Sequence, residues 1–307
     1  MNEPLSSYFK VGIVQFMAYP NCLKGEGPIA DYVKKIVEDD FFQAIEITWV
    51  KDPAERKKVA DLLRASHMTV GFGAQPSLLT TGYDLNNLNP ETRQIAIDQI
   101  KAMVDMAAEM GITKVAFLSG KDPGEADREK ATALLTDSLN QICAYAQEKG
   151  IYIILETFDR TIDKKALIGP AREAAAVAKA VRASHSNFGL MMDLSHLPQQ
   201  FESAAEALPL VKDYLVHVHI GNCVTKDPAM PAYGDQHPRF GFPNGDVDVP
   251  EVADFLTQLF KIGYLGKGKA ELPVVAFEVK PVGDESPEVV IANAKRTLLE
   301  AWAKVSL

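Results

Sequence analysis

The feature that most limits the fold of this chain is a regular alternation of short apolar runs with longer segments of helical period. The runs are rich in Val, Ile and Phe, and they begin at Val11, Phe42, Thr69, Lys114, Ile151, Phe188, Leu215 and Val274. This alternation is typical of βα units around a parallel sheet. Eight strands favour a (β/α)8 TIM barrel, an α/β fold, because a doubly wound sheet usually stops at about five to seven strands.

The segments between the runs predict helices over residues 90–110, 124–149 and 286–304. The first two are followed by Gly111 and Gly150, and glycine suits the left-handed residue that ends a helix. No linker or internal repeat divides the chain, so we expect a single domain over residues 1–307. A long loop, residues 222–249, follows the seventh run and is expected over the C-terminal face of the barrel, where barrel enzymes hold their catalytic residues.

Composition excludes some classes of function. The chain has 307 residues, 47% of them hydrophobic, and a net charge of −9, which argues against a general attraction to nucleic acid or to a membrane surface. Three widely spaced cysteines favour a reducing compartment over a disulfide framework. No apolar run approaches the roughly 18 residues that span a membrane, and the first residues do not resemble a signal peptide. We expect a cytoplasmic protein.

Charged residues stand near the carboxyl ends of four consecutive strands, the fifth to the eighth. They are Glu156, Asp193, His219 and Glu278. Neighbouring strands of a barrel would aim these side chains at one point above the barrel. Three carboxylates this close would repel one another unless a cation lay between them. The pattern therefore predicts one divalent metal ion, with Mn²⁺ expected first and Mg²⁺ or Co²⁺ as alternatives, although Zn²⁺ also accepts mixed oxygen and nitrogen ligands.

Two histidines alternate in the seventh run. His217 and His219 are two residues apart on a strand, so both side chains should face the barrel interior, with His219 nearer the mouth. We interpret His219 as the ligand and His217 as a hydrogen-bonded interior residue that supports it. Glu46, flanked by Ile45 and Ile47, is interpreted as a similar interior polar support.

The motifs that carry these residues resemble the xylose isomerase-like barrel superfamily of sugar isomerases and epimerases. ETFDR at Glu156 resembles the strand-five motif, with Asp159 at the usual position of Asn. DLSH at Asp193 resembles the strand-six Asp-x-x-His pattern, HVHIGN resembles the strand-seven His-x-His pattern, and FEVKP supplies the strand-eight glutamate. The resemblance covers nearly the whole chain.

The resemblance to the ketose epimerases of this superfamily implies roles for individual residues. Their metal is bound at the positions of Glu156, Asp193, His219 and Glu278, and the two glutamates also exchange protons with the substrate. The position of His196 contacts sugar hydroxyls. Many relatives carry an arginine six residues beyond the strand-seven histidine, where this chain has Thr225. Arg239 in the long loop is a candidate replacement.

Two further residues have alternative interpretations. His237, in the same loop as Arg239, is either an acid or base or a solvated loop histidine. Lys280 shares the inward direction of Glu278, and it is either a partner of the substrate or a lysine that extends from the barrel mouth into water. Substrate binding is therefore assigned as an expectation to His196, Arg239, His237 and Lys280.

These features predict a metal-dependent sugar isomerase or epimerase that removes a proton next to a carbonyl and forms an enediolate. An alternative is a lyase that cleaves oxidised (3-keto) glycosides, such as C-glycosides, together with a small partner subunit. A more remote alternative is a DNA repair enzyme like the apurinic endonucleases, which would need more histidines and a basic face. A barrel that binds a sugar without catalysis would have little use for paired glutamates.

The expected partner is a small carbohydrate without phosphate, since no Gly-rich phosphate loop is evident in the sequence. Neither nucleic acid nor a membrane is expected as a partner. Assembly with copies of itself or with a small partner subunit is compatible with the sequence.

Overall fold

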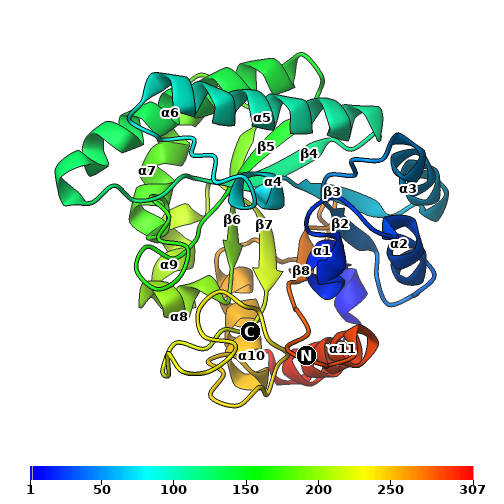
Figure 1. Ribbon diagram of the computed structural model, residues 1–307. Helices are drawn as coiled ribbons and strands as arrows, with labels where there is room; N and C mark the ends of the chain where they lie inside the picture. The colour runs from blue at the N-terminus through cyan, green and yellow to red at the C-terminus, as the bar shows by residue number, and fades with distance from the viewer. Residues whose placement is uncertain (2, 307) are drawn as a thin grey trace.

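The computed structural model describes residue 1 and residues 3–306. Eight parallel strands form the centre of the molecule and helices surround them (Figure 1). The strands are β1 (Lys10–Ile13), β2 (Ala44–Ile47), β3 (Thr69–Gly73), β4 (Lys114–Leu118), β5 (Tyr152–Glu156), β6 (Phe188–Asp193), β7 (Leu215–Ile220) and β8 (Val274–Phe277). The helices are α1 (Gln15–Ala18), α2 (Ile29–Val37), α3 (Pro53–Ser66), α4 (Gln75–Leu79), α5 (Pro90–Glu109), α6 (Glu125–Gln147), α7 (Ala171–Arg182), α8 (His196–Gln200), α9 (Ala204–Val211), α10 (Val249–Lys261) and α11 (Pro287–Lys304), with short 3₁₀ turns at Leu5–Ser7 and Pro20–Cys22.

The strands form a nearly closed barrel. Their order is β1-β8-β7-β6-β5-β4-β3-β2, so β1 pairs with β8 across the two ends of the chain. Between β1 and β2 the described residues form an isolated parallel bridge from Val14 to Glu46. The predicted (β/α)8 TIM barrel is therefore confirmed.

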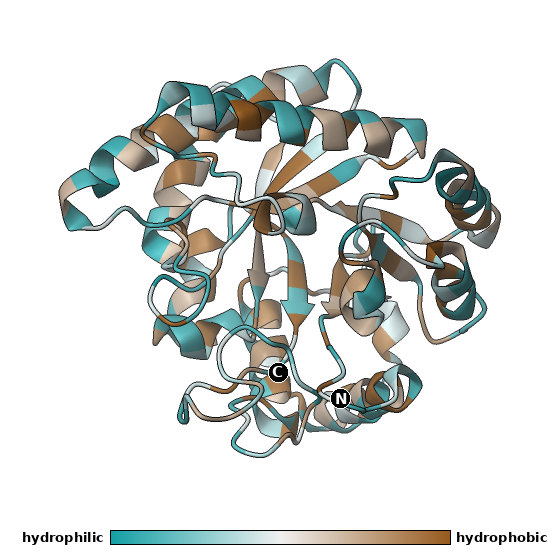
Figure 2. Cartoon of the chain, viewed as in Figure 1, coloured by the Kyte–Doolittle hydropathy of each residue, from teal (hydrophilic) through white to brown (hydrophobic). Residues whose placement is uncertain are grey.

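Residues alternate along each strand between two environments. Outward-facing residues such as Ile45, Ile47 and Phe277 join the large core shared with the helices. Two small separate clusters, Ala44 with Val274 and Ala276, and Ala116 with Ile154 and Met191, comprise alternate residues of their strands, which places them on the inner side. Figure 2 shows apolar residues along the strands and hydrophilic residues among the apolar ones of the surrounding helices.

The first strand is shorter than its apolar run predicts. The run from Val11 extends to Ala18, but β1 ends at Ile13 and Gln15–Ala18 forms the helix α1. The carbonyl of Val14 accepts hydrogen bonds from the backbone N–H groups of Met17 and Ala18, which closes a helical turn at the barrel mouth. Short apolar runs suit a strand and a buried helix equally, so periodicity alone could not separate them.

The long helices agree with the prediction. Asn89 begins α5 by accepting hydrogen bonds from the backbone N–H groups of Glu91 and Thr92, and Gly111 and Gly150 follow α5 and α6 with φ of 77° and 67°. Among residue 1 and residues 3–306, no helix is long and apolar enough to cross a membrane.

The loop between β7 and α10 is ordered by its own side chains. Asn222 donates from Nδ2 to the carbonyl of Arg239 at 3.0 Å and accepts at Oδ1 from the backbone N–H of Val247 at 2.9 Å. Val224 also forms bridges with Tyr233 and Gly234. These contacts fold the loop back on itself at the carboxyl end of β7.

Candidate metal and substrate site

Four side chains converge at the carboxyl ends of adjacent strands. Glu156 ends β5, Asp193 ends β6, His219 lies on β7 and Glu278 follows β8. One ligand atom of each lies within 4.8 Å of the others, and all four residues are buried. The closest contact joins Nδ1 of His219 to Oε2 of Glu278 at 2.6 Å. The structure thus brings together the four residues predicted as metal ligands.

The cluster has the donors and the burial that a divalent cation requires. Within the part of the chain that the structure describes, Oε1 of Glu156 and Oδ2 of Asp193 are buried without a hydrogen-bond partner. The other oxygens are held, since Gln75 donates to Oε2 of Glu156 at 2.7 Å and the backbone N–H of Ser195 donates to Oδ1 of Asp193 at 2.6 Å. Buried carboxylate oxygens without partners are unfavourable, and a cation bound among them would satisfy both. These donors fit a hard or borderline divalent ion.

The two glutamates differ in protonation. Burial, followed by the nearby negative charge of Glu278, raises the pKa of Glu156 to about 8. Burial also opposes ionisation of Glu278, but the positive charges of His237 and His219 outweigh it and lower the pKa of Glu278 to about 2. One carboxyl group is therefore protonated near neutral pH and its neighbour is ionised, a pattern that commonly marks acid and base roles.

A second polar layer lies below the cluster. Oε1 of Glu46 accepts hydrogen bonds from Nε2 of His219 at 2.9 Å and from Nε2 of His217 at 2.8 Å. The two imidazoles share one side of β7, as the alternation predicts, with ring centroids 5.2 Å apart. Both histidines therefore contact the same carboxylate on β2, and only His219 also reaches the upper cluster.

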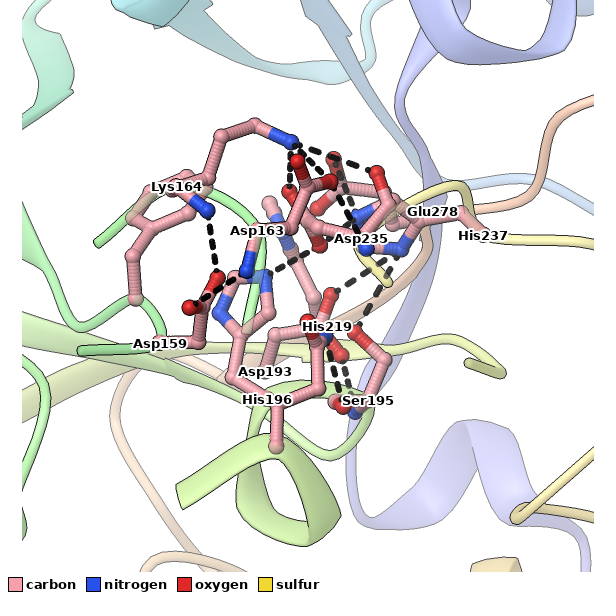
Figure 3. A network of polar contacts seen from close by, with 12 residues as sticks. Asp159, Asp163, Lys164, Asp193, Ser195, His196, His219, Asp235, His237 and Glu278 are labelled. Atoms are coloured by element: carbon pink, nitrogen blue, oxygen red, sulfur yellow. Dashed lines mark hydrogen bonds and ion pairs between the residues drawn. The ribbon is translucent and has the colours of Figure 1, made fainter. Parts of the chain in front are cut away.

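Asp235, in the long loop, contacts the side chains of Lys164, His196 and His237 (Figure 3). Its Oδ1 lies 2.9 Å from Nε2 of His196 and 2.8 Å from Nε2 of His237, and its Oδ2 lies 2.7 Å from Nζ of Lys164. Burial favours the neutral carboxyl group, but Lys164 and the two histidines lower the pKa of Asp235 well below its usual range. A buried carboxylate thus fixes both histidines beside the cluster.

Asp159 supports this network from the loop after β5. Its carboxylate accepts hydrogen bonds from the backbone N–H groups of Ile162, Asp163 and Lys164 at 2.7 to 2.8 Å. The turn that results places Lys164 against Asp235 and Asp163. Asp159, which replaces the asparagine of the resembled motif, therefore organises a loop in this structure.

A cavity of about 190 Å³ opens beside the cluster. Its polar lining includes His219, Glu278, Asp235, His237, Gln75 and Lys280, and its apolar lining includes Phe16, Met17, Leu79 and Phe158. Nζ of Lys280 donates to Oε1 of Gln236 at 2.6 Å. Burial and the neighbouring Lys164 lower the pKa of Lys280. Both Lys280 and His237 face this cavity, so neither extends freely into solvent.

His196 is buried and is not among the described residues that line the cavity; its Nδ1 lies 2.6 Å from the carbonyl oxygen of Thr157 and 3.9 Å from Oε1 of Glu156. Burial opposes protonation of His196, but Asp235 outweighs it and raises its pKa to about 10.

Arg239 lies apart from these residues. Its Nε donates to Oε1 of Glu285 at 2.8 Å, and its guanidinium lies over the ring of Phe242. Within the described residues, Arg239 does not line the cavity beside the cluster. Thr225 is also engaged elsewhere, because its backbone N–H and hydroxyl both donate to Oδ2 of Asp246. The structure therefore shows neither residue beside Glu156 and Glu278.

Sequence reasoning missed Asp235 and Gln75. Asp235 lies two residues before His237 in the sequence GDQHPRFG, so the long loop itself was the available signal. Gln75 begins α4 directly after β3, and nothing in its local sequence distinguishes it from an ordinary surface glutamine. Both residues contact site residues that are distant in the sequence, because Asp235 contacts His196 and Gln75 contacts Glu156.

Comparisons with known proteins agree with this architecture. The family model described as Xylose isomerase-like TIM barrel matches residues 35–266. No match is found among curated proteins.

Several solved structures share the fold. D-psicose 3-epimerase from Clostridium cellulolyticum H10, solved with D-tagatose, is 19% identical with a TM-score of 0.66, and the alignment covers 96% of each chain. An L-ribulose 3-epimerase is 17% identical with a TM-score of 0.68, also covering 96% of each chain. The 3-keto-D-glucoside 4-epimerase from E. coli is 17% identical with a TM-score of 0.64, covering 94% of this chain and 98% of that one.

At these identities the solved structures establish a shared fold, and the family model extends over most of the sequence. This chain belongs to the xylose isomerase-like TIM barrel family.

Proposed function

We propose that this protein is a divalent-metal-dependent sugar epimerase or isomerase that moves a proton at a carbon next to a carbonyl group. The observation that carries the proposal is the convergence of Glu156, Asp193, His219 and Glu278 within one buried cluster at the carboxyl ends of four adjacent strands. The fold shared with several sugar epimerases supports the same class of reaction.

These four side chains would hold the cation, with Mn²⁺ expected first and Mg²⁺ or Co²⁺ as alternatives. A divalent cation bound there would supply positive charge that makes the C–H group next to a substrate carbonyl more acidic.

The two glutamates would move the proton. Glu278, which is ionised at neutral pH, takes the proton from the substrate carbon, and Glu156 returns to the substrate a proton that it takes up from solvent. A proton returned to the opposite face of the same carbon gives an epimer, whereas a proton returned to the neighbouring carbon gives an isomer. Gln75 orients Glu156 through the hydrogen bond to Oε2.

The substrate would lie in the adjoining cavity. His237 and Lys280, which line this cavity, provide donors for hydroxyl and carbonyl oxygens, and His196 supports this side of the site by sharing Asp235 with His237. Phe16, Met17 and Leu79 provide an apolar wall that excludes water from the reacting carbon. We propose a small carbohydrate without phosphate as the substrate, and a cytoplasmic setting that agrees with three buried free cysteines.

A second cavity favours a second candidate, an enzyme of oxidised glycosides. This cavity, of about 390 Å³, lies at the end of β4 and shares Leu79 and Lys164 with the first. Its lining combines apolar Tyr83 and Leu118 with polar Asp84 and Asn87, a mixture suited to the second ring of a glycoside. The same acid and base acting on a 3-keto-glycoside would give either epimerisation or cleavage β to the ketone.

The experiment begins with metal analysis of the purified protein by mass spectrometry. About one divalent ion per chain is expected, and the ion should be lost in Glu278→Gln but retained in Glu129→Gln, a control on the exposed surface of α6. The loaded protein is then incubated in D₂O with a panel of ketoses and 3-keto-glycosides and followed by NMR.

Deuterium entering a carbon next to the carbonyl supports proton transfer at this site. Exchange confined to the glycosides supports the second candidate. A protein that binds no ion after reconstitution, or a loaded protein that exchanges no substrate proton, contradicts the proposed function.

A further inference from the structure

The layer beneath the cluster contains an arrangement that the proton-transfer chemistry does not use directly. Glu46 on β2 lies across the barrel from His217 and His219 on β7, and the residue is only 4% exposed. A buried carboxylate is unfavourable unless it is paired and hydrogen-bonded. Here a single oxygen, Oε1 of Glu46, accepts hydrogen bonds from the imidazoles of both histidines. These two hydrogen bonds offset the cost of burying the carboxylate.

The geometry distinguishes the two nitrogens of His219. Nε2 lies 2.9 Å from Glu46, whereas Nδ1 lies 2.6 Å from Glu278 and 3.7 Å from Oε1 of Glu156. A carboxylate accepts hydrogen bonds and cannot donate them, so Nε2 must carry a proton. Nδ1 faces the carboxylate of Glu278, so the proton on Nδ1 is the one that a cation in the cluster would displace to reach the lone pair of this nitrogen.

The barrel backbone makes room for this contact. Gly71 on β3 pairs in register with Glu46, and a Cβ atom at Gly71 would lie 3.0 Å from Cγ of Glu46. Glu46 also forms the bridge with Val14 that links β1 to β2. The backbone of Glu46 is therefore fixed in the barrel wall, and His217 contacts the carboxylate at the end of its side chain.

We propose that Glu46 is a positioning residue that keeps the proton of His219 on Nε2 and turns Nδ1 towards the carboxylate cluster, with His217 holding Glu46 in place. This inference rests on the proposed function, because it assigns Glu46 to the same cation site. Partners of this kind on metal-binding histidines typically change metal affinity by about 10- to 100-fold.

The test compares three variants of the full-length protein by calorimetric titration with Mn²⁺. In Glu46→Gln the side-chain amide can donate a hydrogen bond to Nε2, so the proton of His219 is no longer kept on Nε2. This variant should weaken Mn²⁺ binding about 10- to 100-fold. His217→Gln should weaken it less, because Glu46 still contacts His219. Met191→Leu is the matched control, since Met191 pairs in register with His217 in the same inner layer but does not contact Glu46 through a hydrogen bond in the described structure. Its affinity should stay near that of the wild type.

A second readout does not need the metal. In the ¹H and ¹⁵N NMR spectrum of the metal-free protein, the Nε2–H proton of His219 should give a downfield signal protected from exchange, and Glu46→Gln should lose that protection. Circular dichroism melting identifies any variant that has failed to fold.

Equal Mn²⁺ affinity in the wild type and a folded Glu46→Gln would overturn the proposal, as would an equal loss in Met191→Leu. If the wild type binds no Mn²⁺, the proposed function fails, but the NMR signal still decides the role of Glu46. An unprotected Nε2–H in the wild type overturns that role, whereas a protected signal lost only in Glu46→Gln supports it.

Discussion

The two halves of the barrel mouth carry different kinds of side chain. The half formed by β5 to β8 ends in buried charged residues, namely Glu156, Asp193, His219 and Glu278. The half formed by β1 to β4 is followed by neutral residues, which include Phe16, Met17, Gln75 and Ser119. Glu46 on β2 is a buried charged residue of this half, and it lies in the lower layer in contact with β7.

This difference assigns different tasks to the two halves. One cation can be shared only by ligand atoms that lie close together, which four adjacent strands provide. The neutral half supplies an apolar wall, and a wall of low polarity strengthens the electrostatic interactions opposite it. Changes in the charged half should therefore alter the chemical step, whereas changes in the neutral half should alter substrate binding.

The largest effect is expected from the two glutamates. Glu156→Gln and Glu278→Gln should each lower kcat by at least about 10²- to 10⁴-fold, because general acid or base transfer is lost and one metal ligand is weakened. The measurement is the rate of deuterium exchange with the best substrate of the panel, with Glu129→Gln as control. A fall of less than about tenfold in both variants would show that neither glutamate transfers the proton.

Asp235→Asn tests the loop that joins the charged half. The substitution leaves Lys164 and two buried histidines without their shared anion, and breaking a buried ion pair typically destabilises a protein by about 3–5 kcal/mol. We expect a loss near the lower end of this range, because Lys164 keeps Asp163 at 3.1 Å. Urea unfolding measures it, with Asp163→Asn as the comparison. Equal stability of Asp235→Asn and the wild type would contradict a central role for Asp235.

Metal binding should depend on pH in a defined direction. The pKa of Glu156 is raised to about 8, so this carboxyl group keeps its proton below that pH in the metal-free protein. The pKa of His219 is also raised, so this imidazole is protonated near neutral pH. A cation must displace these protons, so its affinity should increase as the pH rises and approach a plateau once both groups have lost them.

Calorimetric titration with Mn²⁺ in buffers of different protonation enthalpy measures the protons released. We expect at least about one per ion near neutral pH. Release of no proton, with an affinity independent of pH, would show that Glu156 and His219 are already deprotonated.

The smallest effect is expected in the neutral half. Leu79 is 45% exposed and borders both cavities. Leu79→Ala should raise KM by a few fold, which corresponds to roughly 1 kcal/mol of lost apolar contact, while kcat stays unchanged. Steady-state kinetics with a free ketose and a 3-keto-glycoside separate the two parameters. A large fall in kcat would contradict the division of tasks between the halves.

Much of the barrel could be predicted because its signals are local. Helices such as α5 and α6 have their period and their final glycine within the segment itself, so Gly111 and Gly150 mark their ends without any knowledge of the fold. The convergence of Glu156 and Glu278 was also predictable, because strand alternation and barrel topology place successive strand ends at one face.

Other features depended on contacts that no local pattern encodes. Gln15–Ala18 has the composition of a strand, but the turn closed on Val14 makes it a helix at the mouth. Asp235 is one polar residue among many in a long loop until folding places it against His196.

The sequence by itself determined the eight βα units and the four charged residues at the ends of consecutive strands, because period 2, period 3.6 and the parallel arrangement are properties of neighbouring residues. Only the tertiary structure decided that Glu46 contacts His219, 173 residues away, and that Gln75 contacts Glu156, 81 residues away. The physical reason is that a side-chain contact across a barrel depends on how the strands are arranged when the barrel closes. Closure brings together residues whose separation in the sequence does not predict their distance in space.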